Sequence, residues 1–515
     1  MKKTFTNHRI AHLLCTVVIT CIISCNNNNE LDETGDPFAS IDFSPYTEGI
    51  SDRVEAYHNI IYPNTANSKS GNVALYIDFS AGMHTAFTNP EIKSLLGDCF
   101  NAILADQFDV YKLVSGTVTP LAVTNPTELG EKVNDSKEYL NKRAPIQMGV
   151  EKIVESNNDA LLITDFEEFQ NDKEVTSTAY LKISFSKWLA KGNSIHFFVA
   201  DYTEGKVTKH IYFTVFSCGT PNAQSLAAKL EPKLALLHTK FYLSTRSYQL
   251  STDYPSEKSG GIFYDPDGKS ENAKNVLDLK NSYVAGLKKG NSFEFYPLGV
   301  DWSTIDQLHE SYKEQNQFKD FFRKLYLDLS NEDSYVYGDF EVKVYDISED
   351  FTQFTKCLEV KNHKPKLDKG SNGEAKFADN ETDPIATGCY NTDGSVKPQW
   401  KYDSISPVIQ TEVFALNQEL LKNTMGSNKK KTEIGVSFDQ KFNGKNIQNP
   451  DGLLRVDVIL KSAQPNLSNP TLAQFIWTNV NGLPNTALRE SIVNTLQDLK
   501  PENKVIYSYY IKTNQ

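Results

Sequence analysis

Several patterns on which common functions depend are missing from this chain of 515 residues. There is no Gly-x-Ser-x-Gly elbow, phosphate-binding loop or dinucleotide-binding fingerprint, so neither a nucleophile nor a nucleotide site is predicted. No apolar run reaches the roughly 20 residues that a membrane-spanning helix requires. The seven cysteines follow no zinc-binding spacing. These absences favour a protein that is not an enzyme, and no cofactor is predicted with certainty.

The charge balance and the aromatic content narrow the class further. The formal net charge is −12, and it falls to −15 without residues 1–24, which contain three positive charges and no acid. Such an acidic chain is a poor partner for nucleic acid or for an anionic lipid surface. Hydrophobic residues make up 39% of the sequence, with 25 Tyr and 29 Phe, which indicates a globular protein that leans toward β-structure.

The N-terminus has the three parts of a bacterial lipoprotein signal. Basic residues precede an apolar run over residues 13–23, whose length suits a signal peptide and is too short for a membrane span. Residues 22–25, Ile-Ile-Ser-Cys, resemble the lipobox of bacterial lipoproteins. The resemblance implies a signal peptide over 1–24 and acyl chains on Cys25, which together hold a protein stably at a membrane. An ordinary secretory signal with an incidental Cys25 is the alternative.

Residues 25–50 begin with a polar, acidic stretch that offers little to pack, so we expect a flexible tether behind the lipidated cysteine. Acidic residues in this position resemble the export signal of surface lipoproteins in some double-membraned bacteria. The resemblance implies a lipid-anchored protein of the outer membrane that faces the cell surface.

Residues 51–240 alternate apolar strands with amphipathic helices, the pattern of an α/β domain with a mostly parallel, doubly wound sheet. Strands are predicted over residues 72–78 and 160–165 by their nearly continuous apolar character. A helix is predicted near 91–105, where apolar residues recur at helical spacing. The last two strands are predicted to pair through a turn at Glu204-Gly205.

In a doubly wound sheet, ligands bind at the carboxyl ends of the strands. Here one predicted strand ends in Asp78-Phe79-Ser80, and a later one ends in Thr164-Asp165. These segments, and the order of elements between them, resemble the von Willebrand factor type A domain. The resemblance implies a divalent-cation site with Asp78, Ser80 and Asp165 as ligands, whose shell is completed by water and by a carboxylate of a protein partner.

Two oxygen ligands of this family's site are missing. Gly82 stands where a second Ser is expected, and the loop over residues 142–147 contains no Thr. Mg²⁺ or Ca²⁺ held by Asp78, Ser80 and Asp165 would depend largely on water and bind weakly. The alternative, which we favour, is that Asp78 and Ser80 only cap the turn.

From residue 241 onward, alternating Tyr- and Phe-rich segments are separated by turn clusters, a pattern typical of antiparallel sandwich-like domains. We expect a β-rich domain over residues 241–362 and a β-rich C-terminal region over 402–515, with a few helices. Residues 363–401 are rich in Lys, Asp, Gly, Asn and Pro and are predicted to form a linker or long loop.

Four cysteines follow Cys25, namely Cys99, Cys218, Cys357 and Cys389. Four cysteines in an oxidising exterior allow three connectivities. Their order favours a disulfide between Cys357 and Cys389, with Cys99 and Cys218 as buried thiols.

The leading hypothesis for function is a non-enzymatic cell-surface lipoprotein that serves adhesion or protein assembly through its type A-like domain. A glycan-binding outer-membrane lipoprotein is the alternative, with aromatic platforms at Trp302, Trp400 or Trp477. A surface hydrolase with dispersed carboxylates is the weakest of the three. The expected partners are the membrane, through the lipid, and a protein or glycan at the cell surface, but not nucleic acid.

We predict that Cys25→Ala leaves the protein without lipid and releases it from the membrane fraction, because acyl chains on this thiol supply the anchor. Metabolic labelling with a fatty-acid analogue, followed by fractionation, measures both effects. Labelling that persists in the variant would contradict the lipobox interpretation.

Overall fold

The computed structural model forms two compact units, one from residues 1–53 and 348–407 and the other from 54–347 and 408–515. The predicted signal peptide with Cys25 lies outside the residues that the structure describes. Within the described residues, no helix combines the length and the apolar composition that a membrane crossing requires. The described residues are 37–38, 50–62, 73–103, 108–141, 143–205, 207–219, 225–237, 239–245, 249–252, 293–296, 325–328, 333–418, 431–433, 436–443, 445, 449, 452–479 and 482–512.

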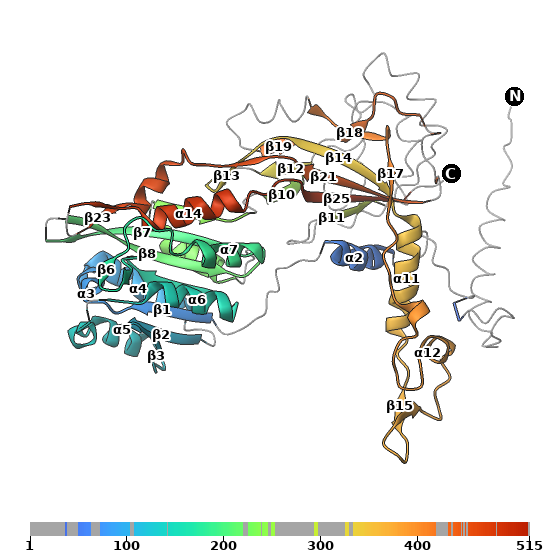
Figure 1. The fold of residues 1–515 in the computed structure, drawn as a ribbon, viewed down its shortest axis with the longest axis horizontal. Coiled ribbons are helices and arrows are strands. Elements are labelled where there is room, and N and C mark those ends of the chain that lie inside the picture. The colour runs from blue at the N-terminus through green and yellow to red at the C-terminus, as the bar shows by residue number, and fades with distance from the viewer. Residues whose placement is uncertain are drawn as a thin grey trace, which may run out of the picture. The chain divides into compact units, whose positions relative to one another are not determined.

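The larger unit contains a seven-stranded sheet of order β3-β2-β1-β4-β8-β7-β9 (Figure 1). Its centre is parallel, with Leu75 of β1 in register with Val110 of β2 and Leu161 of β4. β3, β8, β7 and β9 run antiparallel to their neighbours. The α/β architecture is thus confirmed, but the sheet is mixed rather than mostly parallel. The strands are β1 Val73–Asp78, β2 Phe108–Val114, β3 Thr117–Pro120, β4 Ala160–Thr164, β7 Ser194–Glu204, β8 Val207–Ser217 and β9 Thr239–Leu243.

One tight turn accounts for the antiparallel pairing of β7 with β8. β7 and β8 pair along their whole length around Glu204-Gly205, as predicted, and Gly205 has a positive φ of 65° that side chains disfavour. A tight turn can join only antiparallel strands, since parallel strands need a long crossover. In the sheet, β8 lies between β4 and β7 and pairs with β4.

Helices cover both faces of the sheet. On one face, α3, α4, α5 and α8 enclose a core that includes Leu75 and Ile77. The predicted helix near 91–105 is α4, whose apolar residues from Ile92 to Ile103 are buried, as their spacing requires. On the other face, α6 and α7 pack through residues such as Trp188. The helices are α3 Ala81–Thr88, α4 Pro90–Ile103, α5 Pro126–Asn134, α6 Ile146–Ser156, α7 Lys182–Ala190 and α8 Leu226–Leu234, with the 3-10 turn η1 Ser136–Tyr139.

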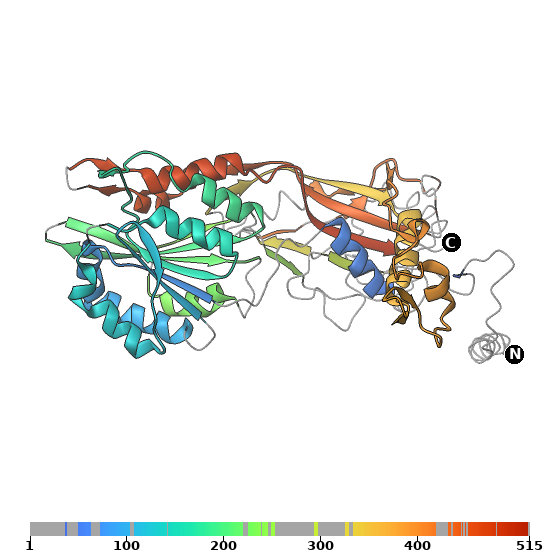
Figure 2. The same cartoon turned by 60° about the horizontal axis from the view of Figure 1, so that its bottom comes forward.

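The C-terminal part of the chain completes the second face of this sheet. The 3-10 turn η6 (Pro470–Phe475) places Phe475 against Phe197 and Tyr212, with ring centroids 5.2 Å and 5.9 Å away. Helix α14 (Ala487–Asp498) lies beside α7 (Figures 1 and 2), where Ser491 Oγ accepts from the Leu181 N–H at 3.2 Å. Residues 470–498 thus belong to the α/β core, although the sequence pattern placed them in a separate β-rich region.

The later part of the chain forms a five-stranded sheet of order β11-β25-β21-β14-β17. This sheet confirms that the later part of the chain is rich in β-strands. β14 comes from the segment 241–362 and pairs with β21 from the segment 402–515, so these segments do not form separate domains. Helix α2 (Ile50–Ile61) contacts this sheet through His58 Nδ1 and the Tyr510 hydroxyl, 2.8 Å apart. The strands are β11 Phe293–Tyr296, β14 Phe340–Asp346, β17 Val408–Gln410, β21 Leu453–Leu460 and β25 Lys504–Lys512.

Smaller groups of strands complete the larger unit. They are a three-stranded sheet of β10 Gln249–Thr252, β12 Leu325–Asp328 and β19 Lys431–Glu433, and the pairs β5 Phe169–Gln170 with β6 Lys173–Glu174, β13 Tyr335–Tyr337 with β22 Ala463–Pro465, β18 Phe414–Leu416 with β20 Val436–Phe438, and β23 Trp477–Thr478 with β24 Pro484–Asn485.

The smaller unit contains the segment 363–401 that was predicted to be a linker or long loop. The segment instead carries a β-hairpin, a short helix and a 3-10 turn, and it follows directly on helix α11. Asp383 helps to hold this regular structure. Its carboxylate accepts from the first N–H groups of α12 and from His363 Nδ1 at 2.7 Å. The elements are α11 Ser348–Asn362, β15 Leu367–Lys369, β16 Ala375–Phe377, α12 Pro384–Cys389 and η4 Pro398–Trp400.

The predicted disulfide between Cys357 and Cys389 is not present among the described residues, where Cys99 and Cys218 are also buried thiols. The two sulfurs have different surroundings. Cys389 packs with Ile385 and Tyr390, whereas Cys357 Sγ accepts from Gln353 Nε2 at 3.8 Å. Sequence order favoured the pairing, but it does not determine which way the side chains of two helices face.

We predict that Phe475→Ala lowers the free energy of unfolding of the larger unit by about 3–5 kcal/mol, because it leaves a cavity among packed aromatic rings. Urea titration followed by circular dichroism measures the change. Leu467→Ala, at a residue that is 46% exposed, is the matched control and should cost less than about 1 kcal/mol. Equal effects of the two substitutions would contradict the assignment of Phe475 to this core.

Candidate functional site

The predicted ligands Asp78, Ser80 and Asp165 all lie at the carboxyl ends of β1 and β4. Asp78 is 0% exposed and closes the turn after β1, where its Oδ1 accepts from the Ser80 N–H at 2.7 Å. Its Oδ2 accepts from the Thr164 hydroxyl at 2.8 Å. The Asp78 carboxylate therefore ties the end of β1 to the end of β4.

Burial makes the charged form of Asp78 costly. It raises the pKa of the Asp78 carboxyl from its usual value of 3.8 to about 6, although the hydrogen bonds from Ser80 and Thr164 act in the opposite direction. Burial also raises the pKa of Asp165, and the negative charges of Glu167 and Asp78 add to that rise. Two carboxyl groups with raised pKa values thus lie at one edge of the sheet.

The backbone after β4 is strained at the same place. Phe166 has a φ of 61°, a conformation that a bulky side chain rarely adopts. Its N–H donates to Thr164 Oγ1 at 3.1 Å, and its C=O accepts from the buried Tyr180 hydroxyl at 3.1 Å. Asp165 Oδ1 accepts from the Glu167 N–H at 3.0 Å and closes the following turn. Packing and these hydrogen bonds hold a turn that the local chain alone disfavours.

Two acidic residues that the sequence analysis missed belong to this edge. Glu167 pairs with Lys209 at 3.2 Å, and Lys209 also reaches Glu204 at 2.9 Å. Glu168 Oε2 accepts from the Gln147 N–H at 2.8 Å, at the start of α6. The signal was present in the sequence, because Glu167 and Glu168 directly follow Asp165 after a continuous apolar run.

The residues present do not fit a closely coordinated divalent ion. Both oxygens of Asp78 already accept hydrogen bonds, Gly82 brings no oxygen, and Ala144 is buried in the core in the loop expected to bring a Thr. Across the described residues, no three His, Cys, Asp or Glu side chains are grouped so that they could hold a metal ion. The geometry is that of a turn cap, and weak binding of Mg²⁺ or Ca²⁺ at Asp78, Ser80 and Asp165 stays a prediction.

Of the three tryptophans proposed as glycan platforms, the structure describes two, and both pack against other residues. Trp477 is 8% exposed, and the Trp400 ring packs edge-on against Phe38 with centroids 4.9 Å apart. Trp302 lies outside the described residues.

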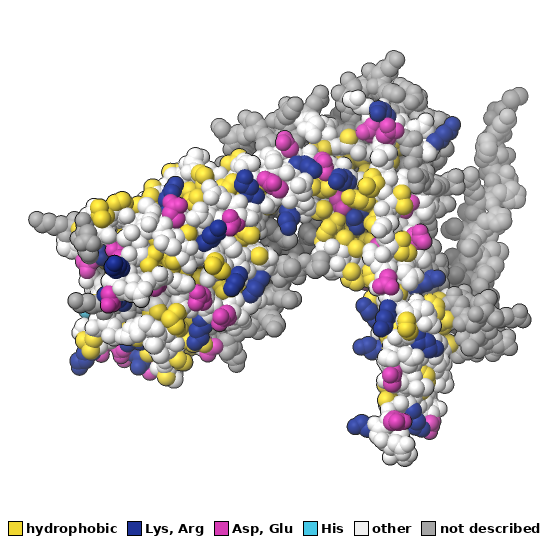
Figure 3. All heavy atoms as spheres, viewed as in Figure 1, with side chains coloured by type: hydrophobic (Ala, Val, Ile, Leu, Met, Phe, Trp, Pro, Cys, Tyr) yellow, Lys and Arg dark blue, Asp and Glu magenta, His cyan; other side chains and the backbone are white. Residues whose placement is uncertain are grey.

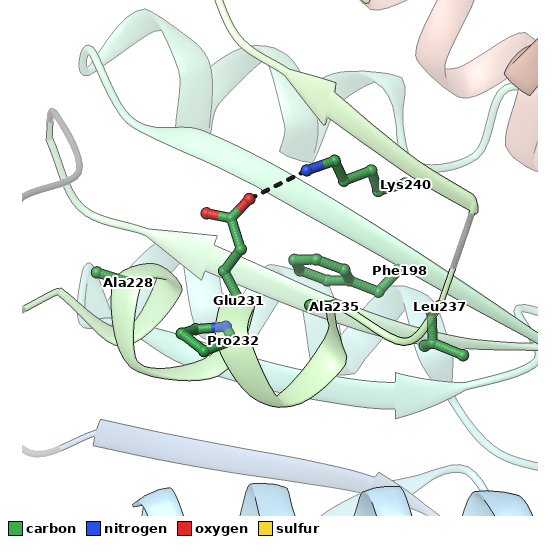
Figure 4. Close-up of a pocket in the computed structure, with 7 residues that line it drawn as sticks. All are labelled: Phe198, Ala228, Glu231, Pro232, Ala235, Leu237 and Lys240. Carbon is green, nitrogen blue, oxygen red and sulfur yellow. Dashed lines mark hydrogen bonds and ion pairs between the residues drawn. The ribbon is translucent and has the colours of Figure 1, made fainter.

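A hollow of about 540 Å³ lies elsewhere in the α/β domain, between α8, β7 and β9 (Figure 4). Its walls are largely apolar and include Phe198 and Leu237. Glu231 and Lys240 form an ion pair of 3.2 Å from α8 to β9 beside the Phe198 ring. The rim is therefore neutral, and the hollow shares no residue with the Asp78 site.

Charge over the visible face of the α/β domain is mixed, with acidic and basic side chains interspersed (Figure 3). Neither a protein-family model nor a curated protein nor a solved structure matches the chain. Membership of the type A family therefore stays a prediction that rests on the residues described above.

We predict that Asp78 lowers the free energy of unfolding by roughly 2 kcal/mol as the pH rises from about 4 to about 6, because the folded state holds the Asp78 proton more tightly than the unfolded chain does. Urea titrations across this range measure the fall. Asp78→Asn keeps an acceptor for Ser80 and should make the fall smaller. If about 1 mM Mg²⁺ or Ca²⁺ stabilises the protein strongly near neutral pH and this effect is lost in Asp78→Asn, the turn-cap interpretation is wrong.

Proposed function

We propose that this chain is a non-enzymatic, lipid-anchored protein of the outer membrane that binds a protein partner at the cell surface. The partner contacts the carboxyl edge of the seven-stranded sheet. The observation that carries the proposal is the exposure of two large apolar side chains beside the Asp78 turn, Leu140 at 82% and Met148 at 49%. Large apolar side chains that a monomer leaves in water are a mark of interaction surfaces when they occur together.

The segment that carries both residues is firmly attached to the sheet edge. Next to Leu140, the Asn141 C=O accepts from the Ala81 N–H at 2.8 Å, beside the turn that Asp78 closes. Next to Met148, the Gln147 N–H donates to Glu168. A backbone held in this way loses little conformational freedom when a partner binds, which favours affinity.

The chain between these two residues also carries a basic side chain. Arg143 forms an ion pair with Asp172 and lies over the Phe169 ring, 5.0 Å from its centroid. Arginine and aromatic side chains are enriched in protein interfaces, where they combine apolar contact with directed hydrogen bonds. Exposed apolar side chains, with an arginine between them in the sequence, support a protein partner better than a small ligand.

The other function classes have less support. Glycan binding through tryptophans is not supported by Trp400 and Trp477, which are packed against other residues. Hydrolysis by paired carboxylates is not supported by Asp78 and Asp165, which are buried. Anchoring through Cys25 depends on the N-terminal signal alone.

We predict that a photo-crosslinking amino acid at position 140 or 148 captures a discrete protein on living cells. The same amino acid at Ile183 or Leu236, which are 68% and 77% exposed, is the control and should capture nothing discrete. Crosslinked products are measured by gel shift and mass spectrometry. The double variant Leu140→Lys and Met148→Lys, tested with a crosslinker at position 172, should lose the product and keep the melting temperature.

Equal products at all four positions, or no discrete product at 140 and 148, would contradict the proposed surface. Capture of a glycan in place of a protein would favour the glycan-binding alternative.

A further inference from the structure

Helix α2 covers charged groups of the five-stranded sheet. Residues of β21 alternate between the two faces of this sheet, and Leu454 and Val456 belong to the apolar core. Arg455 and Asp457 therefore point to the opposite face. Helix α2 lies beside this sheet (Figure 1), and the hydroxyl of Tyr62, directly after the helix, donates to Asp457 Oδ2 at 2.7 Å. The helix is thus attached to the polar face of the sheet.

A buried ion pair is the centre of this contact. Arg455 Nε donates to Asp457 Oδ2 at 3.0 Å, and the two residues are only 5% and 1% exposed. Ser508 Oγ of β25 donates to Asp457 Oδ1 at 2.7 Å. The Arg455 guanidinium lies over the Tyr62 and Tyr345 rings, 5.4 Å and 4.8 Å from their centroids. One Nη atom of Arg455 has no hydrogen-bond partner among the described residues, so its positive charge is only partly compensated.

His58 of α2 is buried next to this positive charge. It is 4% exposed, and its Nδ1 lies 2.8 Å from the hydroxyl of Tyr510, which is in register with Arg455. Burial lowers the pKa of His58 to about 4, the charge of Arg455 adds to the fall, and the Glu55 carboxylate acts in the opposite direction. The imidazole of the docked helix is therefore neutral near pH 7, and a proton on it would place two like charges in one buried contact.

The sign of the pH effect follows from this difference in pKa. The undocked His58 has the ordinary pKa of 6.5, so it takes up a proton first as the pH falls. Its contribution to docking is complete above about pH 6.5 and is lost as the pH falls toward 4. The tyrosines of this face stay neutral in that range. Asp457 partly opposes the loss, because burial raises its pKa and the docked state then holds its proton more tightly.

We propose that α2 is an acid-released cover of the five-stranded sheet, which detaches when His58 takes up a proton while the α/β domain stays folded. The two apolar cores of the larger unit include no residue of α2, so they do not depend on the docked helix. Detachment uncovers the polar face of the sheet around Arg455. This device is independent of the proposed contact surface, because it uses neither Leu140 nor Met148.

The test measures amide hydrogen exchange of the purified full chain by mass spectrometry at about pH 7.5 and about pH 5, with rates corrected for the intrinsic effect of pH. Protection of the amides in α2 reports its docking. We expect this protection to fall by up to about 30-fold, the value that the two pKa values of His58 give. Helix α4 should keep its protection, which separates release of α2 from unfolding of the larger unit.

Matched variants identify the titrating group. His58→Gln keeps a polar partner for Tyr510 but gains no proton in this range, so protection of α2 should change less than about three-fold between the two pH values. Tyr510→Phe removes the hydrogen bond but leaves the imidazole buried, so protection should be lower at both pH values and still fall with acid. His210→Gln, at a histidine of β8 that contacts Asp201, is the control and should behave as the unmodified protein does.

The proposal is overturned if α2 keeps its protection at the lower pH, or if His58→Gln loses protection as the unmodified protein does. Simultaneous loss of protection in α2 and α4 also overturns it, since acid then unfolds the larger unit as a whole. None of these outcomes bears on the crosslinking at positions 140 and 148, so failure of this device and failure of the proposed function can be distinguished.

Discussion

The carboxylate of Asp78 is the constraint on which the carboxyl edge of the sheet depends. It accepts from the Ser80 N–H and from the Thr164 hydroxyl, and so it fixes the turn after β1 and the end of β4 in one contact network. Its burial is costly for a charged group, and the hydrogen bonds only partly offset that cost. The buried carboxylate thus fixes the geometry of this edge at a cost in stability.

The loop after β4 is fixed at a second place, by the C-terminal part of the chain. Asn485 Nδ2 donates to Glu174 Oε1 at 2.7 Å and to the Val175 C=O at 2.9 Å, while the Thr486 N–H donates to the Thr176 C=O at 2.6 Å. These contacts join the loop after Asp165 to the start of α14. The loop that follows Asp165 is therefore held by β1 at its start and by the C-terminal segment further along.

The proposed contact surface has a mainly apolar character. Leu140 and Met148 offer apolar surface on a firmly attached segment, which suits a folded partner that excludes water from the contact.

The sequence by itself determined the local elements, because hydrophobic periodicity depends only on which face of a strand or helix is buried. β1, β4, α4 and the turn at Glu204-Gly205 were predicted in this way, as was the place of Asp78 and Asp165 at the ends of two strands. Only the tertiary structure decided which distant segments pair. The return of β8 beside β4, the sharing of one sheet by β14 and β21, and the packing of α14 on α7 depend on contacts between residues far apart in the chain. No local pattern encodes such partners. For the same reason the sequence analysis predicted a disulfide that is not formed, and it missed Glu168 as the cap of α6.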